Sequence, residues 1–121
     1  MNREETNRAE REDCPWGSYL VLYEEKGCKV KRILVRPGKR LSLQRHKYRA
    51  EHWHLVRGDA LVTRDGEVIR MQAGQSLDIP LGAVHRIENV GQEDVIVIEV
   101  QAGTYLGEDD IERFEDDFGR A

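Results

Sequence analysis

Cysteine is scarce in this chain, because its 121 residues include only Cys14 and Cys28. Two cysteines exclude a disulfide-rich framework and a metal cage built from cysteine alone. We expect both to be free thiols in a reduced compartment. No apolar run approaches the roughly 20 residues of a membrane span, and the N-terminus lacks the apolar core of a signal peptide. We therefore expect a cytoplasmic protein with no membrane partner.

The chain also lacks the net positive charge that is typical of a nucleic-acid-binding protein. The formal net charge is −4 at pH 7, so the chain presents no overall basic field and nucleic acid is not an expected partner. The length and the 39% hydrophobic content suit one domain with a single core. Residues 1–13 are almost all polar or charged, which predicts a flexible tail, with one folded domain over residues 14–121.

Short runs rich in β-branched and aromatic residues, separated by glycine or proline, fill the rest of the chain and are typical of strands. The predicted strands are 18–23, 30–35, 40–44, 51–57, 59–63, 67–71, 76–79, 84–89 and 94–101. Asp65-Gly66 is a hairpin signal. The pattern predicts an all-β jelly-roll barrel. The spacing of Ile111, Phe114 and Phe118, near 3.6 residues, predicts a short C-terminal helical segment or turn on the barrel.

Two segments carry a candidate metal site. The first reads G-x5-Q-x-H-x4-E-x6-G, with Gln44, His46 and Glu51 at its polar positions, and the second reads G-x5-P-x-G-x2-H-x3-N, with His85 inside it. Gln44 and His46 share one face of a strand, and turns can bring Glu51 and His85 to the same place. The mixed nitrogen and oxygen donors suit one divalent metal at an open catalytic site, with zinc first and manganese, cobalt, nickel or iron as alternatives.

Strand parity assigns the faces of two predicted strands. If Glu51 points into the barrel, His52 and His54 point out, because side chains alternate along a strand. A His-x-His pair on one strand is itself a metal motif, so ligation by His52 and His54 is the rival assignment. Apart from Glu99, residues 95–100 are apolar on both faces of the predicted strand. This predicts a core-facing inner side and a homodimer interface on the outer side.

These motifs closely resemble those of the cupin family, with Gln44 in place of the usual first histidine. Residues 41–53, with Pro-Trp-Gly before them and 97–111 after them, are similar to the type II mannose-6-phosphate isomerase domain. In that family the cupin usually forms the C-terminal part of a longer enzyme that also makes GDP-mannose. The glycine-rich nucleotidyltransferase signature has no counterpart here. Two departures concern the substrate pocket, because the family tends to have arginine at Cys14 and an apolar residue at His54.

The resemblance implies a metal-dependent isomerase that interconverts mannose 6-phosphate and fructose 6-phosphate through a cis-enediol. A divalent metal would polarise the carbonyl and hydroxyl oxygens. Gln44 is a neutral oxygen donor, which favours this Lewis-acid role over oxygen activation. Two other classes remain open at this point. One is a non-catalytic sugar-binding cupin module, and the other is a different metal-dependent cupin enzyme, such as a sugar-phosphate epimerase or a dioxygenase.

The implied reaction also needs a proton-transfer group and a phosphate site. Glu99 and Lys31 are polar residues on otherwise apolar strands and are the candidate catalytic residues. Lys31 has the alternative role of holding substrate oxygens. Arginine and lysine suit a phosphate group, the former as a bidentate fork. The candidate phosphate ligands are Arg49, Lys47, Arg113 and Arg120, of which the last two resemble family positions.

Overall fold

The computed structural model describes residues 11–120, and this part of the chain is all-β, without a helix. The strands are β1 (Arg11–Cys14), β2 (Gly17–Glu25), β3 (Cys28–Val35), β4 (Leu43–Arg45), β5 (Arg49–Arg57), β6 (Asp59–Arg64), β7 (Glu67–Gln72), β8 (Ser76–Ile79), β9 (His85–Asn89), β10 (Val95–Gly103) and β11 (Glu112–Glu115). None of these described residues forms a helix that could cross a membrane.

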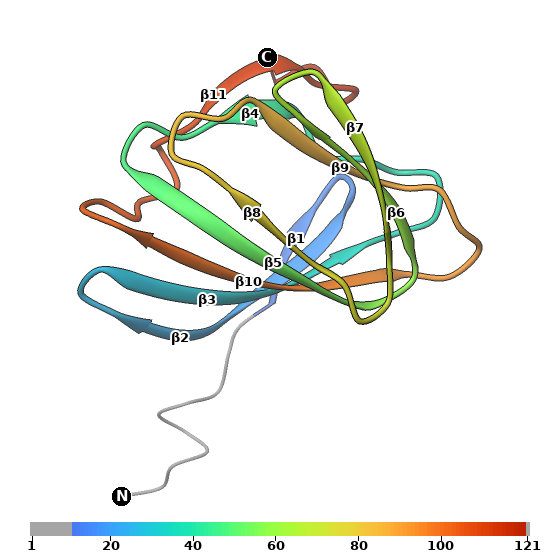
Figure 1. Cartoon of the computed structure of the whole chain (residues 1–121), viewed down its shortest axis with the longest axis horizontal. Helices are drawn as coiled ribbons and strands as arrows, with labels where there is room; N and C mark the ends of the chain where they lie inside the picture. The colour runs from blue at the N-terminus through green and yellow to red at the C-terminus, as the bar shows by residue number, and fades with distance from the viewer. Residues whose placement is uncertain (1–10, 121) are drawn as a thin grey trace, which may run out of the picture.

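The strands make two antiparallel sheets that face each other (Figure 1). One sheet has the order β1-β2-β3-β10-β5-β8, and the other has the order β11-β4-β9-β6-β7. Strands that are distant in sequence are neighbours, as where β10 lies between β3 and β5. The predicted jelly roll is confirmed, and it takes the form of two packed sheets.

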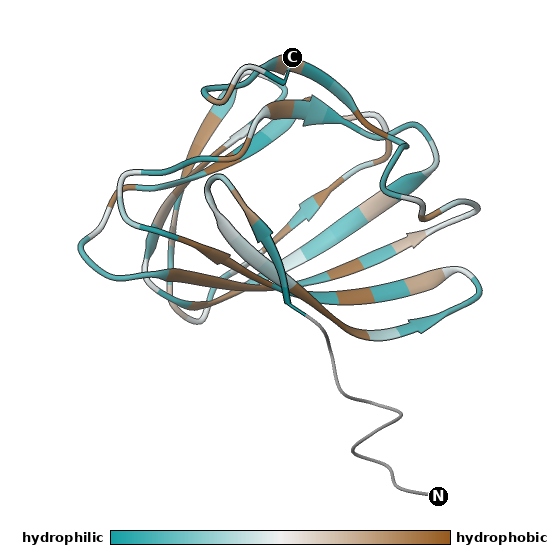
Figure 2. Ribbon diagram, turned by 180° about the vertical axis from the view of Figure 1, so that it is seen from behind, coloured by the Kyte–Doolittle hydropathy of each residue, from teal (hydrophilic) through white to brown (hydrophobic). Residues whose placement is uncertain are grey.

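Alternation along the strands creates the inner faces of the sheets. In β3 every second residue is buried, and Ile33 and Val35 point inward together with Lys29 and Lys31. Figure 2 shows the corresponding alternation of hydrophobic and hydrophilic bands along the strands. The buried apolar core contains Trp16, Ile33, Val35, Leu41, Trp53, Leu55, Ala60, Val62, Met71, Ile79, Ala83, Ile87, Val95 and Val97. The inner face of β3 is thus apolar at one end and charged at the other.

The β6–β7 hairpin turns through the predicted Asp-Gly pair. Asp65 has φ 48° and Gly66 has φ 83°, and two consecutive positive φ angles are the requirement of a type I′ turn. Gly58, between β5 and β6, has φ 98°, and a Cβ there would lie 2.9 Å from the Asp94 carbonyl oxygen. Glycine is therefore required at Gly58 for both conformation and space.

The two ends of the chain differ from expectation. The prediction of a C-terminal helical segment is wrong. Residues 112–115 instead form β11 and pair with β4, which would otherwise be the edge strand of its sheet. Phe118 packs against the core whereas Phe114 stays exposed, so the apolar residues do not form one helical face. Residues 11–13 belong to β1 and not to a tail. The rest of the expected tail, 1–10, lies outside the described residues.

Candidate metal centre and cavity

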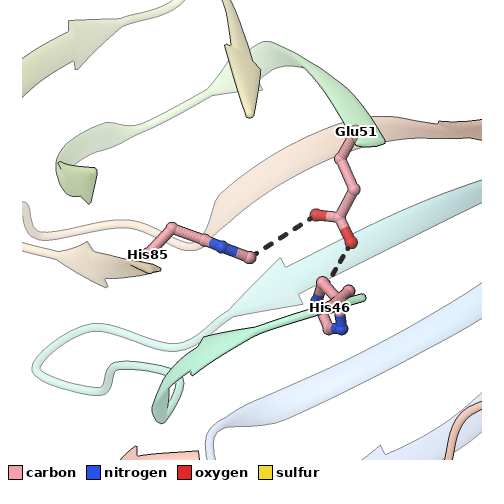
Figure 3. A group of neighbouring side chains, drawn as sticks. All are labelled: His46, Glu51 and His85. Atoms are coloured by element: carbon pink, nitrogen blue, oxygen red, sulfur yellow. Dashed lines mark ion pairs between the residues drawn. The ribbon is translucent and has the colours of Figure 1, made fainter. Parts of the chain in front are cut away.

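Three of the predicted metal ligands meet in the interior. Nitrogen atoms of His46 and His85 and a carboxylate oxygen of Glu51 all lie within 4.8 Å of one another (Figure 3). Glu51 comes from β5 and His85 from β9, while His46 directly follows β4. His46 Nε2 lies 3.2 Å from Glu51 Oε2, and His85 Nε2 lies 3.7 Å from Glu51 Oε1. The structure therefore brings the three side chains from three strand segments to one point.

Backbone carbonyls fix the tautomer of both histidines. His46 Nδ1 donates to the Asp110 carbonyl at 2.7 Å, and His85 Nδ1 donates to the Ala83 carbonyl at 2.8 Å. The Nε2 lone pairs consequently face the cluster, and among the described residues His85 Nε2 has no hydrogen-bond partner. A metal-binding histidine commonly has its other ring nitrogen held in this way.

The electrostatics of the cluster also suit a metal. Burial, followed by the charge of Arg49, lowers the pKa of His46 to about 4. Burial likewise lowers the pKa of His85. Both imidazoles are therefore neutral at pH 7, which is the form that binds a metal. Two imidazole nitrogens and a carboxylate are a donor set that zinc and neighbouring divalent metals accept, so these residues fit the expected group.

The other two histidines, His52 and His54, lie outside the metal cluster, as strand parity predicted. His52 is exposed and bonds Asp78 at 2.6 Å, while His54 bonds Ser76 at 2.8 Å. Neither belongs to the cluster that the described residues form. Gln44 lies opposite His85 in the β4–β9 register, but its Oε1 accepts a hydrogen bond from Ser42 Oγ at 2.8 Å. Its role as a metal ligand stays a prediction.

A cavity of about 240 Å³ opens next to the cluster and collects most of the other candidates. This volume is somewhat below the roughly 300–1,000 Å³ of typical ligand sites, and so suits a small ligand. Seven residues that the sequence singled out line it, namely Lys31, Gln44, His46, Arg49, Glu99, Arg113 and Arg120. Lys47 is not among them, and lies at a separate surface pocket with Tyr48 and Tyr105.

The floor of the site follows from strand register. Residues of β3, β10 and β5 form three cross-strand rows on the inner face, which are Lys29–Gln101–Glu51, Lys31–Glu99–Trp53 and Ile33–Val97–Leu55. The third row belongs to the apolar core. In the first two rows every side chain except Trp53 is polar and buried. On β3 and β10 the apolar core therefore gives way to the polar site within two residues of chain.

Glu99 lies at the centre of the second row. Its side chain accepts hydrogen bonds from Gln101 Nε2 at 2.6 Å and from Trp53 Nε1 at 3.2 Å. Burial, and then the negative charge of Glu51, raises the pKa of Glu99 to about 7. A carboxyl group with such a pKa exchanges protons near neutral pH, as a general acid–base group requires.

Lys31, the other catalytic candidate, is paired. Its Nζ lies 2.6 Å from Glu108 Oε2 and 4.2 Å above the Tyr19 ring centroid. Burial opposes ionisation of Glu108, but the charge of Lys31 and its hydrogen bond together lower the pKa of that carboxyl. The C-terminal segment thus supplies the counter-ion of a buried lysine at the cavity.

Arg49, a candidate phosphate ligand, lies in the interior beside the metal cluster. The side chain is buried, and its Nε donates to Glu51 Oε2 at 2.9 Å. Its Nη2 lies 3.2 Å from His46 Nε2. Among the described residues, its buried Nη1 has no hydrogen-bond partner. Arg49 therefore lies against the metal cluster and also lines the cavity, and its role in binding phosphate stays a prediction.

The two C-terminal arginines are in different states. Arg113 lines the cavity and, within the described part of the chain, its buried Nε has no hydrogen-bond partner. Arg120 also lines the cavity, but its Nε and Nη2 donate to the Asp116 carboxylate at 2.6 and 3.1 Å. Arg113 thus has a free donor for an anion, whereas the charge of Arg120 is already paired.

Sequence reasoning missed three residues that shape the site. These are Trp53, Gln101 and Asp110, none of which has a role in the sequence analysis. The Asp110 carbonyl orients His46, and its carboxylate accepts hydrogen bonds from the backbone of Lys47 and Tyr48. Trp53 and Gln101 could have been found from their spacing, because each lies two residues from a candidate on the same strand.

Comparisons with known proteins identify the family of the chain. The family model described as "Mannose-6-phosphate isomerase C-terminal" matches residues 1–116. Xanthan biosynthesis protein XanB of Xanthomonas campestris pv. campestris (strain B100) is 54% identical over 106 residues, covering 88% of this chain and 23% of XanB. Mannose-1-phosphate guanylyltransferase ManC of Salmonella typhimurium is 50% identical over 106 residues, covering 88% of this chain and 22% of ManC. The chain spans less than a quarter of the length of these relatives.

Solved structures show the same fold at low sequence identity. An oxalate decarboxylase from Lactobacillus farciminis has a TM-score of 0.77 at 21% identity, covering 90% of this chain and 34% of that one. The cupin domain of Cnp3 from Schizosaccharomyces pombe has a TM-score of 0.69 at 20% identity, covering 71% of this chain and 64% of that one. The chain has the cupin fold and belongs to the mannose-6-phosphate isomerase C-terminal family.

Proposed function

We propose that this protein is a metal-dependent aldose–ketose isomerase that interconverts mannose 6-phosphate and fructose 6-phosphate. The observation that carries the proposal is the buried carboxylate of Glu99 at the same cavity as the candidate metal ligand His46. The family supports the choice of a mannose phosphate as substrate. A cytoplasmic location, where the chain meets a phosphorylated sugar, is part of the same proposal.

The reaction needs two proton movements that the residues of this cavity can serve. One proton passes from C2 to C1 of the sugar, and one hydroxyl proton passes from O2 to O1, through a cis-enediol, so that atoms and charge balance. Glu99 takes the proton from C2 and returns it to C1. Lys31 holds hydroxyl oxygens of the substrate. A divalent metal, zinc first, bound by His46, Glu51 and His85 would supply Lewis-acid polarisation of the C1 and C2 oxygens.

The phosphate end of the substrate belongs, in this proposal, beside the C-terminal segment. Arg113 supports this placement because the residue lines the cavity and, among the described residues, its buried Nε lacks a hydrogen-bond partner. A guanidinium group binds phosphate oxygens through charge-assisted hydrogen bonds. Arg49 lies deeper, against the metal cluster, and so meets the sugar end. Arg120 contributes less, because Asp116 holds it.

A homodimer through the outer face of β10 is part of the proposal as well. Ile96 is buried, and Ile98 and Val100 on the same outer face are half-buried. A second copy would cover this apolar strip. Sedimentation equilibrium of wild-type protein and an Ile98→Glu variant tests this, since the variant should be monomeric. A monomeric wild-type protein would remove the dimer from the proposal without affecting the reaction.

The experiment that tests the function is a coupled assay of metal-stripped protein with mannose 6-phosphate. Zinc, manganese, cobalt, nickel and ferrous iron are added one at a time, and fructose 6-phosphate is measured. Metal-dependent turnover that falls about 100–10,000-fold in the Glu99→Gln variant, to a small but measurable residual rate, is the expected result. No turnover by a protein that still binds metal and sugar phosphate would contradict the isomerase and leave a sugar-binding module. Oxygen consumption or an epimeric product would instead identify another cupin enzyme.

A further inference from the structure

Two side chains with no direct part in the proposed chemistry hold the Glu99 carboxylate. Gln101 Nε2 donates to Glu99 Oε1 at 2.6 Å, and Trp53 Nε1 donates to Glu99 Oε2 at 3.2 Å. Glu99, Trp53 and Gln101 are 4%, 2% and 0% exposed. A carboxylate with a buried donor on each oxygen is held in one orientation, here at the cavity that Glu99 lines.

The same indole group also contacts the candidate metal centre. Trp53 Nε1 lies 3.0 Å from Glu51 Oε1, so its single N–H is shared between the carboxylates of Glu51 and Glu99. The indole ring meets the His85 ring edge-on, with centroids 5.6 Å apart. Trp53 thus connects the candidate acid–base group to two of the candidate metal ligands.

Strand register produces this arrangement. Glu51 and Trp53 are two residues apart on β5, and Glu99 and Gln101 are two residues apart on β10, so each pair shares the inner face. Trp53 lies directly opposite Glu99, and Glu51 lies directly opposite Gln101. The four residues form a square of side chains, which we call the carboxylate square.

The fold alone does not require polar residues at the carboxylate square. The next inward pair on the same two strands, Leu55 and Val97, is apolar and lies in the core. Burying two carboxylates and an amide in place of such a pair is unfavourable unless they are fully hydrogen-bonded. Within the described residues, the buried Oε1 of Gln101 has no partner. A square that costs stability is better explained by a role at the cavity than by packing.

We propose that Trp53 and Gln101 are positioning residues that fix the Glu99 carboxylate at a set distance from Glu51 and aim it at the cavity. Neither residue touches the reacting atoms; both act through Glu99. The catalytic part of this inference rests on the proposed function, because it takes Glu99 as the group that moves the proton. The shared hydrogen bond of Trp53 is a separate statement about geometry.

The kinetic test uses Trp53→Phe and Gln101→Met, each alone and combined with Glu99→Gln. Met71→Leu is the control for a change in core packing, because Met71 is buried but does not line the cavity. Each positioning variant should lower kcat by about 10–100-fold, with the KM for mannose 6-phosphate within about threefold of wild type. In the Glu99→Gln background the same changes should have no further effect. Additive losses would overturn the positioning role.

The geometric test needs neither metal nor turnover. The chain has 2 tryptophans, so a ¹⁵N–¹H spectrum contains two indole resonances, and the Trp16→Phe variant assigns them. The Trp53 indole resonance should move in Glu99→Gln and in Glu51→Gln, whereas that of Trp16 should stay in place. A Trp53 resonance unmoved by either change would overturn the shared hydrogen bond.

The two tests separate the failure of this inference from that of the proposed function. Wild-type protein without turnover, but with the expected movement of the Trp53 resonance, would reject the isomerase and retain the hydrogen-bonded square. Wild-type protein with turnover, but with additive losses, would retain the isomerase and reject the positioning role. Circular dichroism of every variant shows whether it folds, and a Trp53→Phe protein that does not fold leaves Gln101→Met to decide.

Discussion

The buried ion pair between Arg49 and Glu51 should contribute measurably to the stability of the metal-free protein. Arg49 Nε lies 2.9 Å from Glu51 Oε2, and the two side chains are only 6% and 1% exposed. The guanidinium group of arginine keeps its charge in proteins. Glu51→Gln therefore leaves a buried cation without its counter-ion. Removing one partner of a buried pair typically costs about 3–5 kcal/mol, which is the loss expected here.

The design compares Glu51→Gln, Arg49→Met and the double variant by urea unfolding in the presence of a chelator. Replacing both charges removes the uncompensated charge, so the double variant should be more stable than the sum of the single losses predicts, by about 2 kcal/mol or more. Arg45→Met is the matched control. Its pair with Glu112 has side chains that are 40% and 47% exposed, and such a surface pair contributes at most about 1 kcal/mol.

Two results would refute this reasoning. Single losses no larger than that of the Arg45 control would mean that the Arg49–Glu51 pair is solvated. Losses that add to within about 0.5 kcal/mol would mean that the two charges do not interact. Either result would also weaken the case for the metal site, because the ion pair with Arg49 would then not hold Glu51 between His46 and His85.

Three further predictions concern metal, pH and phosphate. His85→Ala should lose bound zinc in equilibrium dialysis, whereas His52→Ala should keep it. Burial raises the pKa of Glu99 from 4.5 to about 7. Between these two pH values folding takes up a proton, so the free energy of unfolding of the wild-type protein falls as pH rises. Relative to metal-free wild type, metal-free Glu99→Gln should therefore become more stable by about 1.4 kcal/mol per pH unit over this range, measured by urea unfolding. A stability difference that does not change with pH would contradict this prediction. Arg113→Met should raise the KM for mannose 6-phosphate about tenfold or more, and Lys47→Ala should leave it unchanged.

Local patterns predicted the parts of the structure that depend on neighbouring residues. The period of two along a strand placed Glu51 inside and His52 outside, because a strand with one buried face has no other register. The Asp65-Gly66 pair specified its turn through backbone conformation alone. For the same reason the nine predicted strands overlap β2 to β10. His46 and His85 were found from motif spacing before any contact was known.

Contacts between distant segments could not be predicted in this way. The sequence made Arg49 a candidate phosphate ligand, but it did not show that the side chain is buried, with Glu51 and His46 accepting its hydrogen bonds. Lys47, two residues away, points to a different surface pocket. The C-terminal segment pairs with β4, about 70 residues earlier in the chain, and no local periodicity encodes such a partner.

Residues 106–110, between β10 and β11, complete the site by providing partners for buried charged side chains. Lys29 and Lys31 are both buried, and an isolated buried ammonium group is strongly unfavourable. Glu108 pairs with Lys31 at 2.6 Å, and Lys29 donates to the Leu106 carbonyl at 2.9 Å. Asp110 then orients His46. Residues 106–110 therefore stabilise the polar end of the inner face, because they satisfy both buried lysines and hold His46 at the cavity.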